Sequence, residues 1–126
     1  MAYQNLLLID DDEDDRGIFT DAVKEVSESV ICHTLSSARE ALKKLLAKDL
    51  KPHVIFLDLN MPVMNGQQFL IEIKKHVELK NIPVIILSTT SNSATIKLTK
   101  ELGAHDFISK PGRFNELVHI LTSILI

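Results

Sequence analysis

The hydrophobic residues of the chain fall into two alternating kinds of segment. The first kind is a short, continuous apolar run rich in β-branched residues, which is typical of strands buried on both faces of a sheet. These runs are residues 6–9, 30–31, 54–57, 84–87 and 107–108. After each run, apolar residues recur at the three- and four-residue spacing of an amphipathic helix, for example over residues 18–26 and 114–125. The pattern predicts five strand–helix units that use the whole chain.

Strands that alternate with helices through short connections predict a parallel sheet with right-handed crossovers and helices on both faces. The punctuation agrees with these boundaries, because Ser37 and Glu40 have the spacing of a capping box and Gly103 follows a helix end. We therefore predict an α/β fold with a five-stranded parallel sheet in a doubly wound, flavodoxin-like (βα)5 sandwich. In such folds, ligands bind beyond the carboxyl ends of the strands.

Length and composition narrow the function classes. The chain has 126 residues, so we expect one domain over residues 1–126 with no output domain. The formal net charge of −3 argues against binding to nucleic acid. With Cys32 as the single cysteine there is no internal disulfide. No apolar run approaches the length of a membrane span and no basic leader is present, so we expect a cytoplasmic protein without membrane contact.

Polar residues follow the predicted strands where each one ends. Asp10 and Asp11 follow the first strand, Asp58 ends the third, Ser88 follows the fourth and Lys110 lies near the end of the fifth. Carboxyl ends of parallel strands share one rim of the sheet, so we expect these side chains to meet.

The acidic run that begins at Asp10 has a simpler interpretation for its later members. Residues 12–15 are adequately explained as solvated acids at a helix N-terminus, where the helix dipole favours them. That interpretation does not explain Asp58, which ends a buried run far away in the sequence.

Carboxylates brought together repel one another unless a cation compensates them. Oxygen ligands without nearby Cys or His favour a hard cation such as Mg²⁺. Lys110 adds a second positive charge and Ser88 a hydroxyl donor. This set suits stabilisation of a phosphoryl group in transfer, with Asp58 as the candidate nucleophile.

The same residues lie in four motifs that resemble the receiver domains of two-component response regulators. The motifs are LLLIDD at 6–11, VIFLDLNMPVMNG at 54–66, PVIILS at 83–88 and GAHDFISKP at 103–111. They occur in the family's order and cover nearly the whole chain.

The resemblance implies a role for each site residue. Asp58 would accept a phosphoryl group from a phosphohistidine on a sensor histidine kinase or a phosphotransfer protein. Asp11, Asp58 and the backbone carbonyl of Asn60 would hold Mg²⁺, with Asp10 acting mainly through a metal-bound water. Lys110 would pair with Asp58 and then with the phosphoryl oxygens.

The resemblance also implies a conformational switch. Ser88 would turn inward to donate to the phosphoryl group, and Phe107 would follow into the vacated space. The Lys110–Pro111 bond would be cis. The fourth helix, the fifth strand and the last helix would form the surface that binds a downstream protein.

Apolar residues at the end of the chain bear on that surface. Ile120 and Ile126 fall away from the apolar stripe of the last helix. They are therefore available for contact with a partner protein, or for a dimer contact through the last two helices. An ordinary core with an exposed hydrophobic end explains them equally well.

One segment departs from the family pattern. Gly112 and Arg113 follow Pro111 where relatives carry an apolar or aromatic residue, so we expect Phe114 to supply the missing packing.

Three other functions fit the sequence less well. An aspartyl-nucleophile phosphohydrolase would need a second carboxylate two residues beyond Asp58, where Asn60 stands, and a cap domain. A scaffold that acts without phosphorylation would be expected to have lost part of the site. A flavin-binding protein of this fold would need a phosphate loop after the first strand, where acidic residues stand instead. We therefore predict a signalling switch and not an enzyme.

Overall fold

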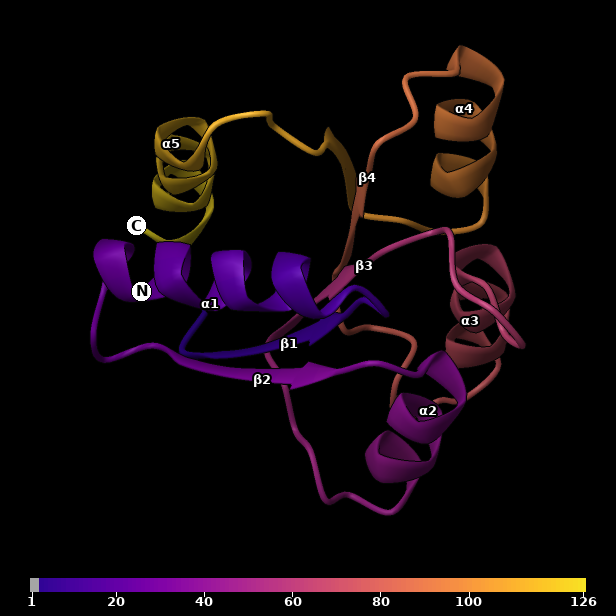
Figure 1. Cartoon of the computed structure of the whole chain (residues 1–126). Helices are drawn as coiled ribbons and strands as arrows, with labels where there is room; N and C mark the ends of the chain where they lie inside the picture. Colours follow the sequence, from indigo (N-terminus) through magenta and orange to yellow (C-terminus); the bar gives the residue numbers. More distant parts are fainter. Residues whose placement is uncertain (1–2) are drawn as a thin grey trace.

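The computed structural model describes residues 3–126 and contains one sheet with helices on both of its faces (Figure 1). Met1 and Ala2, which belong to the predicted domain, lie outside the described residues. The elements are β1 (Asn5–Ile9), α1 (Glu13–Val26), β2 (Ile31–Leu35), α2 (Ala38–Leu46), β3 (Val54–Leu57), α3 (Gly66–Lys74), β4 (Val84–Ser88), α4 (Ser93–Glu101), β5 (Asp106–Ser109) and α5 (Phe114–Leu125). No helix of residues 3–126 is long and apolar enough to cross a bilayer.

All neighbouring strands are parallel and follow the order β2-β1-β3-β4-β5. The register aligns Ile9 of β1 with Leu57 of β3, and Leu57 with Ile86 of β4. β3 is therefore the central strand, and its carboxyl end lies between those of β1 and β4. The predicted doubly wound (βα)5 architecture is confirmed.

Two apolar clusters hold the helices against the sheet. On one face, Phe19 of α1 and Leu117 and Leu121 of α5 pack on the strands, with the rings of Phe19 and Phe56 5.0 Å apart. On the other face, helices α2 and α3 cover the sheet through Leu45 and Phe69 and their neighbours. The strands β1, β3 and β4 lie between both layers and are buried throughout, apart from Asn5.

The prediction that all five strands are buried on both faces is wrong for β2 and β5. Ile31 of β2 is 54% exposed, and Asp106 and Ser109 of β5 are also exposed. These two strands are the edges of the sheet, so each has a neighbour on one side only and is less well covered by helices. Apolar composition alone does not report the position of a strand within a sheet.

The predicted helix punctuation is largely present. Ser37 caps α2 by accepting from the amide of Glu40 at 3.2 Å. Gly103 follows α4 with a φ of +108°, a backbone conformation that glycine tolerates best. A reciprocal capping box is formed by Asn65 and Gln68 at the start of α3.

The cysteine and one histidine have roles in the packing and hydrogen bonding of the fold. Burial raises the pKa of the Cys32 thiol to about 11, against a smaller opposing effect of its hydrogen bond with Thr20. His53 Nδ1 accepts hydrogen bonds from the backbone amides of Gln4 and Asn5, each at 3.1 Å. The histidine thus anchors the start of β1 to the segment before β3.

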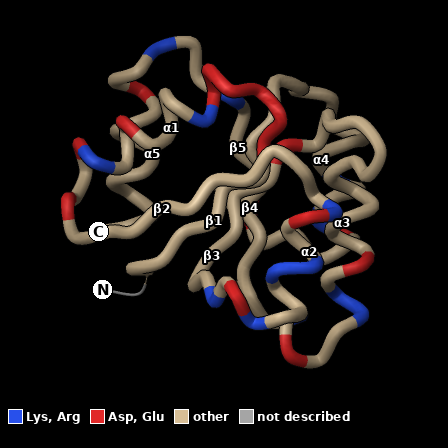
Figure 2. Tube along the Cα trace, turned by 60° about the horizontal axis from the view of Figure 1, so that its bottom comes forward, with Lys and Arg blue, Asp and Glu red and all other residues tan. Residues whose placement is uncertain are grey.

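Charge is distributed unevenly over the two sides of the molecule (Figure 2). Acidic residues predominate from Asp10 to Glu28, where Arg16 and Lys24 are the basic residues. Lysines are concentrated instead in and between α2 and α3, mixed with fewer acidic residues. The net charge of −3 therefore conceals a strongly acidic region around the start of α1.

Candidate functional site

The carboxyl ends of the strands bring the predicted polar residues to one rim of the sheet. Asp10 follows β1, Asp58 follows β3, Ser88 ends β4 and Lys110 follows β5. Carboxylate oxygens of Asp10, Asp11 and Asp58 all lie within 4.8 Å of one another. The structure therefore brings Asp58 together with Asp10 and Asp11, which the sequence placed in another motif.

Asp58 carries its carboxylate in a buried position at the end of the central strand, with 5% of the residue exposed. Burial raises its pKa to about 6, the charge of Lys110 opposes this shift, and the charge of Asp10 adds to it. The amide of Asn60 lies 3.4 Å from Asp58 Oδ1 and helps to orient it. The ionised carboxylate is therefore held at a cost, and a further cation would favour it.

Asp10 is the most deeply buried member of the cluster, at 1% exposure. Its Oδ1 accepts from the amide of Asp12 at 2.9 Å, and its Oδ2 accepts from Lys110 Nζ at 3.0 Å. Its backbone carbonyl accepts from Arg16 Nη1 at 2.9 Å. Asp10 thus ties β1, the start of α1 and Lys110 together.

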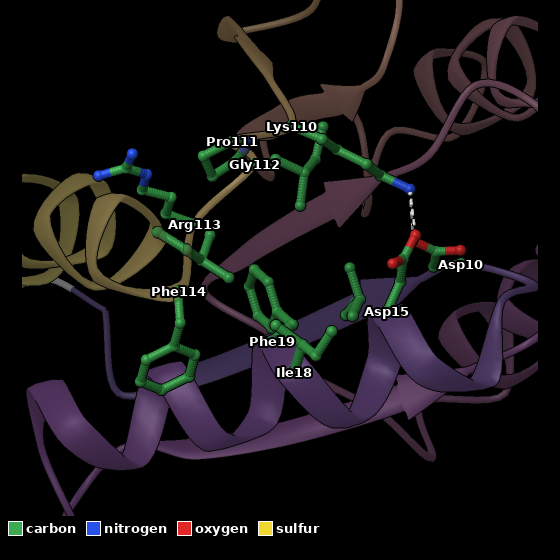
Figure 3. A pocket seen from close by; sticks show the side chains of 12 residues that line it. Asp10, Asp15, Ile18, Phe19, Lys110, Pro111, Gly112, Arg113 and Phe114 are labelled. Carbon is green, nitrogen blue, oxygen red and sulfur yellow. Dashed lines mark hydrogen bonds and ion pairs between the residues drawn. The ribbon is translucent and has the colours of Figure 1, made fainter.

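Lys110 reaches from the end of β5 toward the carboxylates of Asp10 and Asp15 (Figure 3). Its Nζ is 2.9 Å from Asp15 Oδ2 but 3.8 Å from Asp58 Oδ1. Burial alone would lower the pKa of Lys110, but hydrogen bonds to Asp15 and Asp10 and the charges of Asp10 and Asp58 outweigh it, so the pKa lies above its ordinary value. In this state the lysine pairs more closely with Asp10 and Asp15 than with Asp58.

Asp15 is the site residue that the sequence interpretation missed. Its place in an acidic run at a helix N-terminus gave it a sufficient explanation without any contact to Lys110. A signal was nonetheless present, because a residue in the first helical turn after β1 lies near the rim where Lys110 was expected.

Ser88 and Phe107 lie on the neighbouring strands β4 and β5. Ser88 is fully buried, and its Oγ accepts from the amide of Thr90 at 3.3 Å. Its backbone carbonyl accepts from the amide of Lys110 at 2.7 Å. Phe107 pairs with Ile86 across the sheet and is half-buried against the α2–α3 side of the core.

Two expectations for the segment after Lys110 are wrong. The Lys110–Pro111 bond is trans, as are all peptide bonds of residues 3–126. The trans isomer is the lower-energy form of most X–Pro bonds. Phe114 does not fill the space left by Gly112 and Arg113, because its side chain begins α5 at the surface and the residue is 40% exposed.

Phe114 instead lines a mainly apolar cavity of about 200 Å³ beside the acidic cluster (Figure 3). Ile18 of α1 and Pro111 form part of the same wall, and Asp15 and Lys110 form its polar end. The cavity therefore adjoins the charged site directly.

Gly66 holds the start of α3 against the end of β3. A Cβ at this position would lie 2.6 Å from the carbonyl oxygen of Asp58 and 2.7 Å from the Cα of Leu59. Its amide donates to the carbonyl of Leu59 at 3.0 Å. The structure thus shows a close backbone approach at Gly66 that only glycine allows.

The donor set fits a hard divalent cation. Asp10, Asp11 and Asp58 offer carboxylate oxygens, and Asp11 is exposed, so a cation with water ligands has access. No cysteine or histidine belongs to this group of described residues. A divalent ion would also offset the repulsion among the carboxylates.

Comparison with known proteins assigns this arrangement to a family. A family model described as the response regulator receiver domain matches residues 6–122. The chain belongs to the response regulator receiver family.

Relatives of similar length support the assignment. The two-component response regulator ORR3 of Oryza sativa subsp. indica is 31% identical over 121 residues, which cover 96% of this chain and 90% of that protein. The crystal structure of the phosphorylated cyanobacterial phytochrome response regulator RcpA superposes with a TM-score of 0.88 at 30% identity, covering 98% of this chain and 91% of that one. The Mn(2+)-bound form of response regulator Rcp1 superposes with a TM-score of 0.85 at 26% identity, covering 96% and 91% of the two chains.

A longer relative is similar over part of its length. The protein-glutamate methylesterase/protein-glutamine glutaminase of Bacillus subtilis (strain 168) is 39% identical over 109 residues. These residues are 84% of this chain but 29% of that protein. The chain thus spans less than a third of this relative, whereas the response regulators of similar length match nearly end to end.

Proposed function

We propose that the receiver works as a phosphorylation-dependent signalling switch in which Asp58 is the phosphoacceptor. The observation that carries the proposal is the convergence of Asp10, Asp11, Asp58 and Lys110 at the rim of the central strand. A buried carboxylate beside a lysine ammonium, in a cluster that can bind a divalent cation, is suited to nucleophilic attack on phosphorus.

The phosphoryl transfer needs only two reactants, the carboxylate of Asp58 as nucleophile and a phosphohistidine as donor. An Asp58 carboxylate oxygen forms the new bond to phosphorus, the phosphorus–nitrogen bond of the donor breaks, and the imidazole leaves with the electron pair and takes up a proton. The product is an acyl phosphate on Asp58. The donor is a sensor histidine kinase or a phosphotransfer protein, since both carry phosphohistidine.

Mg²⁺ would be held by Asp11, Asp58 and the backbone carbonyl of Asn60, with Asp10 acting through water. When bound, the ion neutralises negative charge on the phosphoryl oxygens in transfer. Lys110 supplies the second positive charge, and its position depends on the carboxylates around it. Together these groups let a negatively charged phosphoryl group enter a cluster that already contains three carboxylates.

The response of the protein begins at Ser88 and Phe107. Ser88 Oγ, which now accepts from the amide of Thr90, would turn to donate to the phosphoryl group. Phe107 would move into the vacated space from its half-buried position on the adjacent strand.

The partner-binding surface would comprise α4, β5 and α5. Leu98 of α4 is 41% exposed and Ile126 after α5 is 76% exposed, which supports apolar contact with a downstream protein or with a second copy through these helices. Phosphorylation would alter this surface through Phe107.

The proposal is tested by incubating the protein with acetyl phosphate and Mg²⁺ and measuring the intact mass. We expect the mass of one phosphoryl group to be added to the wild type and none to Asp58→Asn. Asp49→Asn, which changes the charge equally in the exposed turn after α2, should be labelled like the wild type. Persistent labelling of Asp58→Asn would place the acceptor elsewhere.

Coupling to the surface is tested with Lys110→Ala. We expect this variant to keep most of its Mg²⁺ affinity but to lose the phosphorylation-induced NMR shifts in α4, β5 and α5 that the wild type shows. Wild-type spectra that are unchanged in these elements on phosphorylation would contradict the switch and favour a scaffold that acts without phosphorylation.

A further inference from the structure

One of the two residues that hold the ammonium of Lys110 lies outside the proposed phosphorylation chemistry. Nζ donates to Asp15 Oδ2 at 2.9 Å and to Asp10 Oδ2 at 3.0 Å, which uses two of its three donors. Asp58 Oδ1, at 3.8 Å, is beyond hydrogen-bond distance. The unphosphorylated site therefore keeps Lys110 at the α1 side of the cluster.

The position of Asp15, from which it holds Lys110, is fixed by α1. It lies in the first turn of α1, and its amide donates to the side chain of the N-cap residue Asp12 at 3.0 Å. Its carboxylate does not belong to the group formed by Asp10, Asp11 and Asp58. Asp15 consequently attracts the lysine from outside this acidic cluster, whereas Asp10 lies within the cluster.

We propose that Asp15 is a positioning residue that holds Lys110 toward α1 until Asp58 is phosphorylated and then releases it. The inference rests on the proposed function, because it takes Lys110 to contact the phosphoryl oxygens. Nζ now lies 3.8 Å from Asp58 Oδ1, whereas an ammonium–oxygen hydrogen bond is about 2.8 Å long, so Lys110 is not in hydrogen-bond contact with the side chain that would carry the phosphoryl group.

The phosphoryl group supplies the force for this release. It adds up to about two negative charges at Asp58 and competes directly with the single charge of Asp15. Because the contact with Asp15 is made in the resting state and lost in the phosphorylated state, its free energy counts against phosphorylation. The Asp15 side chain is 40% exposed, so the pair should shift the equilibrium by about two- to fivefold.

The test compares Asp15→Asn with Asp14→Asn. Asp14 lies in the same helical turn, is exposed, and makes no ion pair or side-chain hydrogen bond with another residue in the described range 3–126, so its variant carries the same charge change without the contact. Affinity for beryllofluoride, a mimic of the phosphoryl group, is measured by NMR titration at saturating Mg²⁺. The Cε and Hε resonances of Lys110 are recorded without ligand.

We expect Asp15→Asn to bind beryllofluoride about two- to fivefold more tightly than Asp14→Asn. We also expect the Lys110 resonances of the ligand-free protein to move in Asp15→Asn alone, which a merely structural role of Asp15 would not produce. Equal affinities in the two variants, weaker binding by Asp15→Asn, or unmoved Lys110 resonances would overturn the inference. Failure of the wild type to bind beryllofluoride and to accept a phosphoryl group would instead overturn the proposed function, and this inference with it.

Discussion

At the scale of single residues, Asp58 is the clearest case of a side chain placed against its own preference. Burial lifts its pKa from the ordinary 3.8 to about 6, so the neutral form stabilises the fold. That contribution is complete below about pH 4 and is lost as the pH rises through about 6. Above that range, the folded protein bears a buried charge.

Replacing Asp58 by Asn should therefore stabilise the metal-free protein at neutral pH. We expect the free energy of unfolding to rise by about 1–3 kcal/mol, and the difference from wild type to vanish toward about pH 4. Urea unfolding with a chelator present measures both values. Asp21→Asn, at an exposed position on α1, should change little at either pH, and a pH-independent effect of Asp58→Asn would contradict the explanation.

Val63 has a strained backbone conformation. It lies between β3 and α3 with a φ of +68° and is 80% exposed, although β-branched residues adopt this conformation at a cost of about 1–2 kcal/mol. We expect Val63→Asn to raise the free energy of unfolding by about 1 kcal/mol, because asparagine tolerates this region. Val77→Asn, at a similarly exposed valine without positive φ, should leave the free energy of unfolding almost unchanged. Thermal unfolding of both variants measures the difference. Equal shifts for both variants would assign the effect to lost apolar exposure instead.

The residues differ in how far the sequence could predict their places in the cluster. The convergence of Asp58 and Lys110 was predicted because each lies at the end of an apolar strand, where a charged residue is unusual. Asp15 was missed because acidic residues at a helix start are common and already favourable. The strain at Val63 was not predictable, since backbone angles of a loop depend on how its two flanking elements are fixed.

At the scale of elements, the junction of β3 with α3 depends on the smallest side chain. The backbone of Asp58 and Leu59 leaves no room for a Cβ at position 66. This backbone cannot move without displacing the site. We expect Gly66→Ala to cost about 1–3 kcal/mol and to shift the NMR resonances of Asp58.

Gly17 provides the opposite case within one fold. It lies inside α1, is exposed, and a Cβ there would meet nothing within 4 Å. We expect Gly17→Ala to stabilise the protein by roughly 0.5–1 kcal/mol through helix propensity, as measured by chemical denaturation. A loss of stability in both variants would contradict the distinction between close approach and open helix surface.

The order of strands and helices was predictable from hydrophobic spacing, and the place of each strand was not. The buried runs of β1, β3 and β4 were identified with nearly correct bounds. β2 and β5 were assigned the same two-sided burial, because a pattern of apolar residues reports that a strand exists but not how many neighbours it has.

At the scale of the whole molecule, a local ion should change global stability. If the acidic cluster binds Mg²⁺ only when folded, tenfold excess over the dissociation constant stabilises the chain by about 1.4 kcal/mol. We expect Mg²⁺ to raise the thermal midpoint of the wild type but not that of Asp11→Asn. In the samples without Mg²⁺, NaCl is added to match the ionic strength. A shift of equal size in both proteins would assign the effect to general screening of the acidic region.

Lys110 meets Asp10 across 100 positions of sequence, and two strands separate β1 from β5 in the sheet. During synthesis, the aspartates leave the ribosome long before the lysine that neutralises them, so an incomplete chain carries only their mutual repulsion. If phosphorylation of Asp58 depends on Lys110, as proposed, a nascent or truncated polypeptide that lacks this lysine cannot be phosphorylated.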